Sequence, residues 1–509
     1  MQWGTPTIFS SLPPPPYVCM YPSASGGLGS LSATTHPTAH AQPDHSNPEI
    51  YINLSILEPL TTAQTWVTGL AQRENIIIFE PIGLIMNLTI KNARIPFTSG
   101  VWDICIEGGH IANIVSSEVR GGSDVLDARG GIVCPGFVDS HIHLDKAYTA
   151  NSLDEAGFEG VAEARDTQGI TPSLRSLKEA FSEGDVLDRG RRVLTESLKH
   201  GTMAHRVFVD VDRIVGLKCF NAALKLKREF NGLMDLQIVA FPQEGLAGNP
   251  ENVELLYKAA ELGADVVGGI PWYENTAEEG ERHLDEVFNA AKSFGKDVHI
   301  VADDTDDPLS TNVLHVASKC LREGFKDRCA ASQCRGALDS PNDAYVNRVI
   351  KLAKLAGLSV VENPQTSLML SGGGSTHPFK RGLTRVLEFA HAGVNVAAGQ
   401  DDIQDAYYPY GRGSMVEVGF IMIHAARIST ARGLQLVYNM ITHNGAKIMK
   451  LKDYGLENGC QANLLVFEEK SVHEIFRNMA RPKHVLRLGV PLLTSTTKTR
   501  FHQPHNLAS

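Results

Sequence analysis

Residues 131–145 read GIVCPGFVDSHIHLD, and the interpretation of the rest of the chain starts from this stretch. An apolar run, broken by Pro135 and Gly136, leads into His141 and His143, which are spaced i, i+2. On a β-strand this spacing places both imidazoles on the same face. Two histidines at a strand end can enter the coordination sphere of one metal ion, although an ordinary pair of strand histidines has the same pattern.

The composition limits the classes of protein to consider. The chain has 509 residues, more than one compact domain usually holds, and 43% of them are hydrophobic. A net charge of −10, with no long basic run, argues against nucleic acid as the main partner. The most apolar stretch, residues 76–86, contains Glu80 and Pro81, so we expect no membrane span. The eight cysteines are scattered and no secretory signal is evident, which favours a reducing, cytoplasmic location.

Three changes of pattern suggest the domain boundaries. Residues 1–48 are rich in Pro, Ser, Thr, Gly and His, and we expect them to be disordered because they cannot bury enough apolar surface. From residue 84 to 135, short strand patterns alternate with glycine turns, which predicts a small β domain. A strand pattern returns after residue 456, so residues 456–500 are expected to complete that domain.

Between these flanks, residues 136–455 alternate strand and helix patterns. The predicted strands cover residues 138–143, 205–211, 236–241, 264–270, 297–303, 328–332, 358–362 and 394–401. Eight strands with intervening helices predict an α/β fold, a (β/α)8 TIM-like barrel whose chemistry lies at the carboxyl ends of the strands. An open doubly wound sheet is the alternative, but no Gly-x-Gly-x-x-Gly follows a strand to support it.

Several further strings extend the pattern around His141, namely QIVAFPQEG (237–245), GADVVGGIP (263–271), RGLTRV (381–386), GQDD (399–402) and YPYG (408–411). Together they resemble the amidohydrolase superfamily of metal-dependent hydrolases, and most closely the bacterial-type cytosine deaminases. The likeness is collinear from about residue 84 to about residue 493. It implies one divalent metal ion, Zn or Fe, at the barrel mouth, and a small-molecule substrate; it leaves room for a homo-oligomer. Activity is a separate question, because a fold does not determine a function.

The resemblance implies five metal-site positions, of which His141, His143 and Asp401 match. Without a gap, the histidine of strand five falls on Val301, while His299 lies two residues earlier. Residues i and i+2 are about 6.6 Å apart along a strand, so His299 could be a ligand only if the strand is shifted or bulged. The histidine of strand six falls on Gln333, and a glutamine is a poor zinc ligand. The remaining two-histidine, one-carboxylate set is a reduced site that can hold Fe(II) or Zn.

The same resemblance assigns roles around the metal. Asp304 stands where the family has a catalytic glutamate, and Asp401 would orient the attacking water. Gln243 matches a residue that hydrogen-bonds a planar, amide-bearing ring, and Tyr407 replaces an aromatic lid residue. Gln400 stands where the family has a further histidine. A turn-capping Gln243 and a simply packed Tyr407 are the structural alternatives.

Two functions of different classes follow. The first is a metal-dependent amidohydrolase or deaminase that hydrolyses a non-peptide C–N bond of a small cyclic amide or amidine. The second is a catalytically silent relative that binds a ligand or a partner, which the changes at Val301, Gln333 and Gln400 would explain. A lyase or cyclase that reuses the site is a third possibility, for which the sequence offers no positive sign.

Overall fold

Eight parallel strands lie in one sheet whose order follows the chain, which confirms the predicted barrel in the computed structural model of this protein. The strands are β8 (Phe137–His143), β9 (Thr202–Asp210), β10 (Asp235–Phe241), β11 (Val266–Gly269), β12 (Asp297–Val301), β13 (Cys329–Ser332), β14 (Ser359–Glu362) and β15 (Val396–Ala398). A parallel bridge between Ile142 of β8 and Asp401, just beyond β15, closes the sheet into a barrel.

The structure describes residues 49–53, 76–79, 87–116, 124–155, 167–372 and 380–496. The expected disorder of residues 1–48 concerns a segment that lies outside this description.

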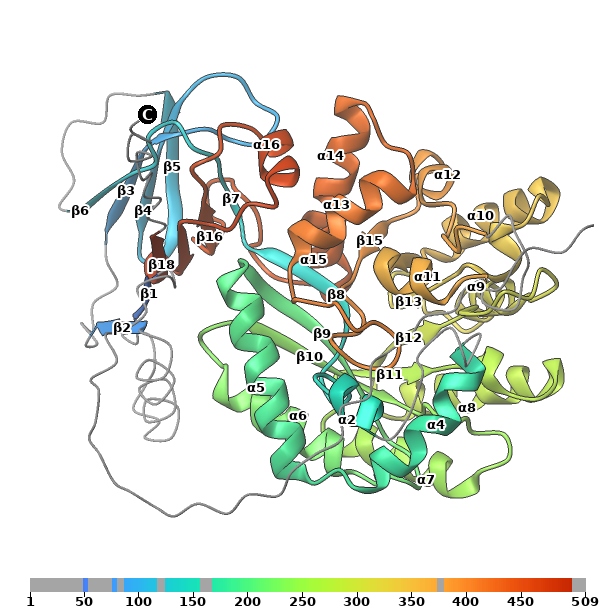
Figure 1. Ribbon diagram of the computed structural model, residues 1–509. Coiled ribbons are helices and arrows are strands. Elements are labelled where there is room, and N and C mark those ends of the chain that lie inside the picture. Colours follow the sequence, from blue (N-terminus) through green and yellow to red (C-terminus); the bar gives the residue numbers. More distant parts are fainter. Residues whose placement is uncertain are drawn as a thin grey trace, which may run out of the picture. The chain divides into compact units, whose positions relative to one another are not determined.

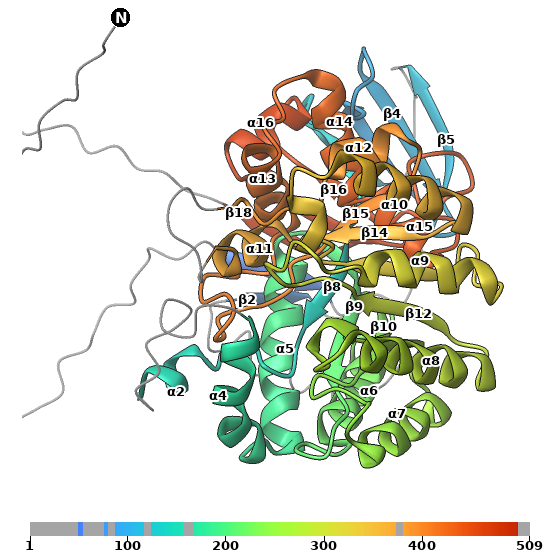
Figure 2. The same ribbon diagram turned by 90° about the vertical axis from the view of Figure 1, so that its right-hand side faces the viewer.

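Helices lie outside the barrel strands and connect them (Figures 1 and 2). They are α2 (Ala150–Glu155), α4 (Thr167–Glu179), α5 (Glu183–Lys199), α6 (Lys218–Glu229), α7 (Pro250–Leu262), α8 (Ala277–Ser293), α9 (Asn312–Arg322), α10 (Asp343–Ala356), α11 (Pro364–Leu370), α12 (Val386–His391), α13 (Met415–Ala425), α14 (Ala431–Met440) and α15 (His443–Met449), with α16 (Val472–Arg477) beyond them. Short 3-10 turns, Pro271–Tyr273 and Gly336–Asp339, follow β11 and β13. The apolar faces of these helices and the outward faces of the strands share one large core, which explains why every residue of β8 and β9 is buried.

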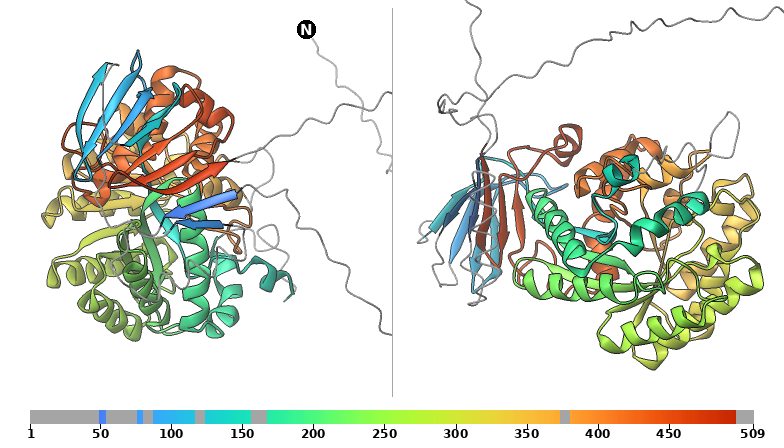
Figure 3. Two further views of the ribbon diagram at one scale, coloured as in Figure 1. Left: turned by 90° about the vertical axis from the view of Figure 1, so that its left-hand side faces the viewer. Right: turned by 60° about the horizontal axis from the view of Figure 1, so that its bottom comes forward.

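A second core belongs to the β domain, whose strands come from both ends of the chain (Figure 3). One sheet contains β3 (Leu88–Ala93), β4 (Trp102–Glu107), β5 (His110–Ser116) and β6 (Asp124–Asp127). The other contains β1 (Glu49–Asn53), β2 (Ile76–Phe79), β7 (Val133–Pro135), β16 (Leu464–Val466), β17 (His484–Arg487) and β18 (Val490–Thr496). Because β16 pairs with β7 and β18 with β1, the domain is split between the two flanks, as predicted.

The sequence pattern assigns no strand to residues 49–82, yet the structure places β1 and β2 there. Both strands are short, and β1 pairs with β2 on one side and, on the other, with β18, near the opposite end of the sequence. Such a pairing leaves no local signal of periodicity, which is why the predicted domain begins only at residue 84. In the part of the chain that is described, no helix is both long and apolar enough to cross a membrane.

Candidate active site

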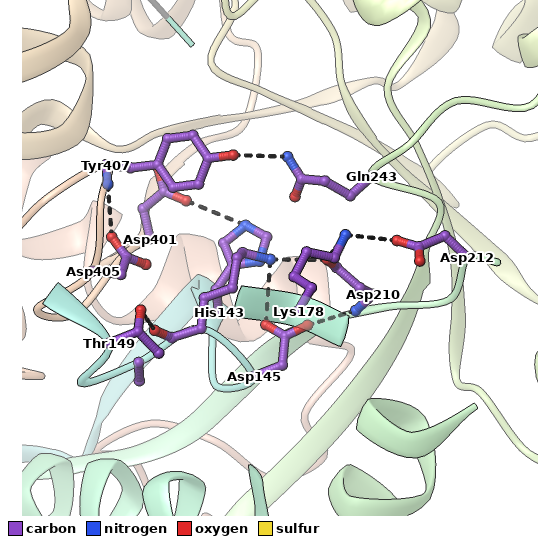
Figure 4. A network of polar contacts seen from close by, with 12 residues as sticks. His143, Asp145, Thr149, Lys178, Asp210, Asp212, Gln243, Asp401, Asp405 and Tyr407 are labelled. Atoms are coloured by element: carbon purple, nitrogen blue, oxygen red, sulfur yellow. Dashed lines mark hydrogen bonds and ion pairs between the residues drawn. The ribbon is translucent and has the colours of Figure 1, made fainter. Parts of the chain in front are cut away.

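The carboxyl ends of β8 and β15 bring three potential metal ligands together, His141, His143 and Asp401. Figure 4 shows His143 and Asp401. The Nε2 atoms of His141 and His143 are 3.3 Å apart. Oδ1 of Asp401 lies 3.3 Å from the first and 3.6 Å from the second of these nitrogens. All three side chains are buried, so the group is enclosed at the barrel mouth.

Backbone contacts hold this group in place. The amide of Asp401 donates to the carbonyl of His141 at 2.7 Å, and the amide of His143 donates to the carbonyl of Asp401 at 2.9 Å. Gly399 permits this approach, because a Cβ at that position would lie 2.7 Å from both Cβ and the carbonyl oxygen of His141. Asp401 itself has φ of 63°, a strained region for a residue other than glycine. The barrel therefore fixes this carboxylate beside the two histidines at a cost in backbone energy.

The three side chains fit a divalent ion. Two ligands about 2.0–2.1 Å from a tetrahedral zinc ion are roughly 3.4 Å from each other, which agrees with the 3.3 Å between the two Nε2 atoms. Oδ1 of Asp401 and both Nδ1 atoms have no hydrogen-bond partner among the described residues. Burial, helped by the charge of Lys146, holds the pKa of His143 well below its usual range, so its imidazole is neutral, as a ligand must be.

His299 lies outside this group, one layer deeper in the barrel. Its strand pairs regularly, with His299 opposite Gly268 and Ala330, so β12 has no bulge that would carry it to the mouth. Its ring stands perpendicular to that of His141, with 5.5 Å between centroids. Nδ1 of His299 is 3.4 Å from Nη1 of Arg206, which can only donate. This contact directs Nδ1 of His299 toward Arg206.

Val301 and Gln333 occupy the positions at which the resemblance implies histidines. Val301 ends β12 and lines the pocket. Gln333 follows β13, and its Nε2 donates to Oδ2 of Asp401 at 2.6 Å. The amide thus steadies the aspartate carboxylate without contributing a metal-binding nitrogen.

Asp304, the expected acid/base residue, is held by a buried arginine. Nε of Arg335 donates to Oδ1 of Asp304 at 2.7 Å, and the two side chains are 1% and 5% exposed. The second arm of Arg335 donates to Asp306 at 2.5 Å and to Ser371 at 3.0 Å. The guanidinium therefore fixes the position of the Asp304 carboxylate at the pocket.

Gln243 and Tyr407 lie together at the pocket. Nε2 of Gln243 donates to the hydroxyl of Tyr407 at 3.4 Å, while its Oε1 has no partner among the described residues. Gln400 is directed elsewhere, because its Nε2 donates to the carbonyl of Asp402 at 3.4 Å. The lining residues are His143, Lys146, Phe241, Gln243, Ile270, Trp272, Val301, Asp304, Gln333, Leu370, Asp401, Asp402 and Tyr407. Polar and apolar side chains are both present among them.

Sequence reasoning missed an ionic cluster beside the metal group. Nζ of Lys146 lies 3.3 Å from Asp145 and 2.9 Å from Asp210, both buried. Asp145 also accepts the backbone N–H of Asp210 at 2.7 Å, which ties the ends of β8 and β9 together. The available signal was the position of charged residues directly after two apolar strands, in HLDK (143–146) and VDVD (209–212).

Comparison with known proteins identifies the same family along the chain. Residues 199–488 match the sequence model of the amidohydrolase family. N-isopropylammelide isopropyl amidohydrolase of Pseudomonas sp. strain ADP is 31% identical over 408 residues, which cover 79% of this chain and 96% of that protein. Pterin deaminase of Rhizobium rhizogenes is 27% identical over 372 residues, 71% of this chain and 81% of that protein.

A solved structure extends the comparison to three dimensions. The crystal structure of 5-methylcytosine deaminase from Klebsiella pneumoniae, liganded with 5-fluorocytosine, superposes with a TM-score of 0.76 at 32% identity. The match covers 81% of this chain and 99% of that one, so it includes both the barrel and the β domain.

Proposed function

Because this chain belongs to the amidohydrolase family, whose members hydrolyse non-peptide carbon–nitrogen bonds, we propose that it is a divalent-metal-dependent enzyme acting on a small cyclic amide or amidine. One observation carries the proposal: two histidine nitrogens and one carboxylate oxygen converge at the barrel mouth within 4.8 Å of one another, and the carboxylate oxygen has no hydrogen-bond partner among the described residues. They form the set His141, His143 and Asp401 that the sequence predicts. A Zn or Fe ion held there would supply the Lewis acidity that activates water.

The remaining residues would bind the ring and move the protons. Oε1 of Gln243 can accept an N–H from the edge of a cyclic amide, because Tyr407 occupies the amide nitrogen of that side chain and so fixes which end is free. Asp304, held in place by Arg335, would take a proton from the attacking water and pass it to the leaving nitrogen. Asp401, steadied by Gln333, would hold the water in line with the ring carbon.

Metal analysis combined with a turnover assay tests this function. Purified protein should retain about one equivalent of Zn, Fe or Mn and should release ammonia or an amine from at least one of cytosine, 5-methylcytosine and N-isopropylammelide. His143→Ala should lose both properties, while the control His315→Ala, on the outer helix α9, should keep both. Less than about a tenth of an equivalent, with no gain on reconstitution, would contradict the proposal.

A silent, ligand-binding relative is the second candidate, and the altered β12–β13 side favours it. Val301 offers no ligand atom, and Gln333 donates to Asp401 instead of binding a metal. Thermal-shift measurements with the same three compounds would reveal binding. Stabilisation by a compound that is not turned over, in protein reconstituted with metal, would establish this second function.

A further inference from the structure

The pocket has room for no more than about one water molecule. Its cavity volume is about 20 Å³, and a single water needs roughly 10–15 Å³ when volume is measured in this way. A heterocyclic ring is several times larger, so at least one lining element has to move before a ring can enter. The elements that could move are the segments that carry or cover the side chains lining the pocket.

Helix α4 packs directly on two of these lining side chains. Ile170 and Leu174 are 0% and 1% exposed, and they form a small apolar cluster with Leu370, Ala406 and Tyr407. Leu370 and Tyr407 also line the pocket. The helix therefore covers the side of the pocket that is formed by the segments following β14 and β15.

The opposite end of α4 carries Lys178, whose ammonium group is buried among the carboxylates of Asp210, Asp212 and Glu244; Figure 4 shows the first two. Nζ lies 2.7 Å from Asp210, 2.7 Å from Asp212 and 3.3 Å from Glu244, and the lysine side chain is only 1% exposed. Burial alone would lower the pKa of Lys178, but the charges of Asp210, Asp212 and Glu244 outweigh it and raise that pKa above the ordinary value. The lysine is thus a permanent cation with no access to water.

The same contacts reach the proposed ring-binding amide. Arg175, one turn earlier on α4, donates through Nε to Oε2 of Glu244 at 2.9 Å, while Lys178 holds the other oxygen. Glu244 directly follows Gln243, whose side chain is bonded to Tyr407. Two cations of α4 therefore act on the residue next to Gln243, and the apolar side of the helix contacts Tyr407.

We propose that Lys178 is a positioning residue that pins α4 over the pocket through Asp210, Asp212 and Glu244, and that a ring enters only when α4 lifts away from Tyr407 and Leu370. When α4 lifts, Lys178 and its carboxylates regain water, which offsets part of the lost ion pairing. The apolar contacts that are lost are those of this small cluster and of Leu177, which also packs against the main core, so opening remains a local event and does not require the barrel to unfold. The inference concerns access to the pocket, and its test needs neither metal nor turnover.

Hydrogen exchange of the full-length protein, followed by mass spectrometry, measures the opening directly. In the wild-type protein, the amides of residues 167–179 should exchange faster than those of β9 and β10, because α4 opens without them. Lys178→Met should accelerate exchange in α4 by roughly tenfold or more, since three clustered carboxylates lose their shared cation, and Lys178→Arg should restore much of the protection. The matched control is Lys319→Met, which removes a buried lysine paired with Asp285 and Glu323 on the outside of the barrel; it should leave α4 unchanged.

A second readout follows access to the pocket itself. In a background where Trp3, Trp66 and Trp102 are replaced by phenylalanine, Trp272 reports on the pocket that it lines. Acrylamide should quench its fluorescence more strongly after Lys178→Met, and after the milder Arg175→Ala, but not after Lys319→Met. If the amides of α4 in the wild-type protein exchange no faster than those of β9 and β10, the proposal is overturned. Quenching that is unchanged in a folded Lys178 or Arg175 variant would overturn it as well.

Discussion

On the β8–β15 side of the pocket, the Nε2 atoms of His141 and His143 are 3.3 Å apart, and Oδ1 of Asp401 beside them has no hydrogen-bond partner among the described residues. On the β12–β13 side, Arg335 holds Asp304 at 2.7 Å and Gln333 reaches across to Oδ2 of Asp401 at 2.6 Å. The first side gathers atoms that suit a metal ion, whereas on the second side the carboxylate of Asp304 is paired with a buried arginine. The comparison teaches that the capacity to bind metal and the stability of the mouth reside in different residues, which can be altered separately.

The largest expected effect is a loss of stability on the β12–β13 side. Arg335→Met should lower the free energy of unfolding by about 3–5 kcal/mol, because it leaves the buried carboxylate of Asp304 unpaired. Arg412→Met removes a half-exposed arginine from its pair with Glu417 and should cost less than about 1 kcal/mol. Urea unfolding measures both values. Equal losses in the two variants would remove the distinction between the buried and the exposed pair.

The next largest expected effect is a loss of metal binding on the β8–β15 side. His141→Ala should weaken metal binding by at least about 100-fold, because loss of a direct ligand should exceed the effect of losing an outer partner of a ligand. Circular dichroism should show that the barrel remains folded, since the removed ring lies at a strand end. Metal content after dialysis is the measurement, and a wild-type stoichiometry in this variant would contradict the site.

Asp303, next to Asp304, should make stability depend on pH. Burial raises its pKa from 3.8 to about 6, against hydrogen bonds from Ser310, Asn312 and the amide of Val313. Between about pH 4 and 6 the folded state therefore binds more protons than the unfolded state, so stability falls as the pH rises through this window. At 1.36 kcal/mol per pKa unit, the loss from this group is about 3 kcal/mol.

Asp303→Asn removes the titrating group but keeps an acceptor oxygen. The difference in unfolding free energy between the wild-type protein and this variant, measured from pH 4 to 7, should change mainly below pH 6. Parallel curves for the two proteins would show that Asp303 titrates at its ordinary pKa in the folded state.

The smallest effect should come from adding metal-binding histidines to the β12–β13 side. Val301→His combined with Gln333→His should tighten Zn or Fe retention by roughly tenfold, because each imidazole adds a nitrogen donor beside the existing group. The gain is limited by the lack of a partner to fix each new tautomer. His299→Ala is the companion variant and should leave the metal content unchanged, since His299 faces Arg206. An empty site in His299→Ala, with no gain in the double variant, would reverse the assignment of strand five.

The sequence predicts those parts of the molecule that depend on local periodicity. Each of the eight barrel strands follows an apolar run, and His141 and His143 are recognisable because both belong to one strand. Contacts between distant side chains have no such signal. The bond from Gln333 to Asp401 joins residues 68 positions apart, and Lys178 meets Glu244 across 66 positions. The sequence shows that Gln333 is not a histidine, but only the folded chain shows what this amide does.

The closure of the barrel between β8 and the segment after β15 also determines when the site can form during folding. His141 belongs to the first barrel strand, and Asp139 of that strand contacts Gln400 across 261 positions of sequence. Closing so long a loop is entropically costly and slow, and its reward comes only when the last strand docks. Until then Asp401 cannot join the histidines, so partly folded chains lack the complete ligand set. A metal that binds this set favours the closed barrel by mass action, and its uptake should therefore be among the last events of folding.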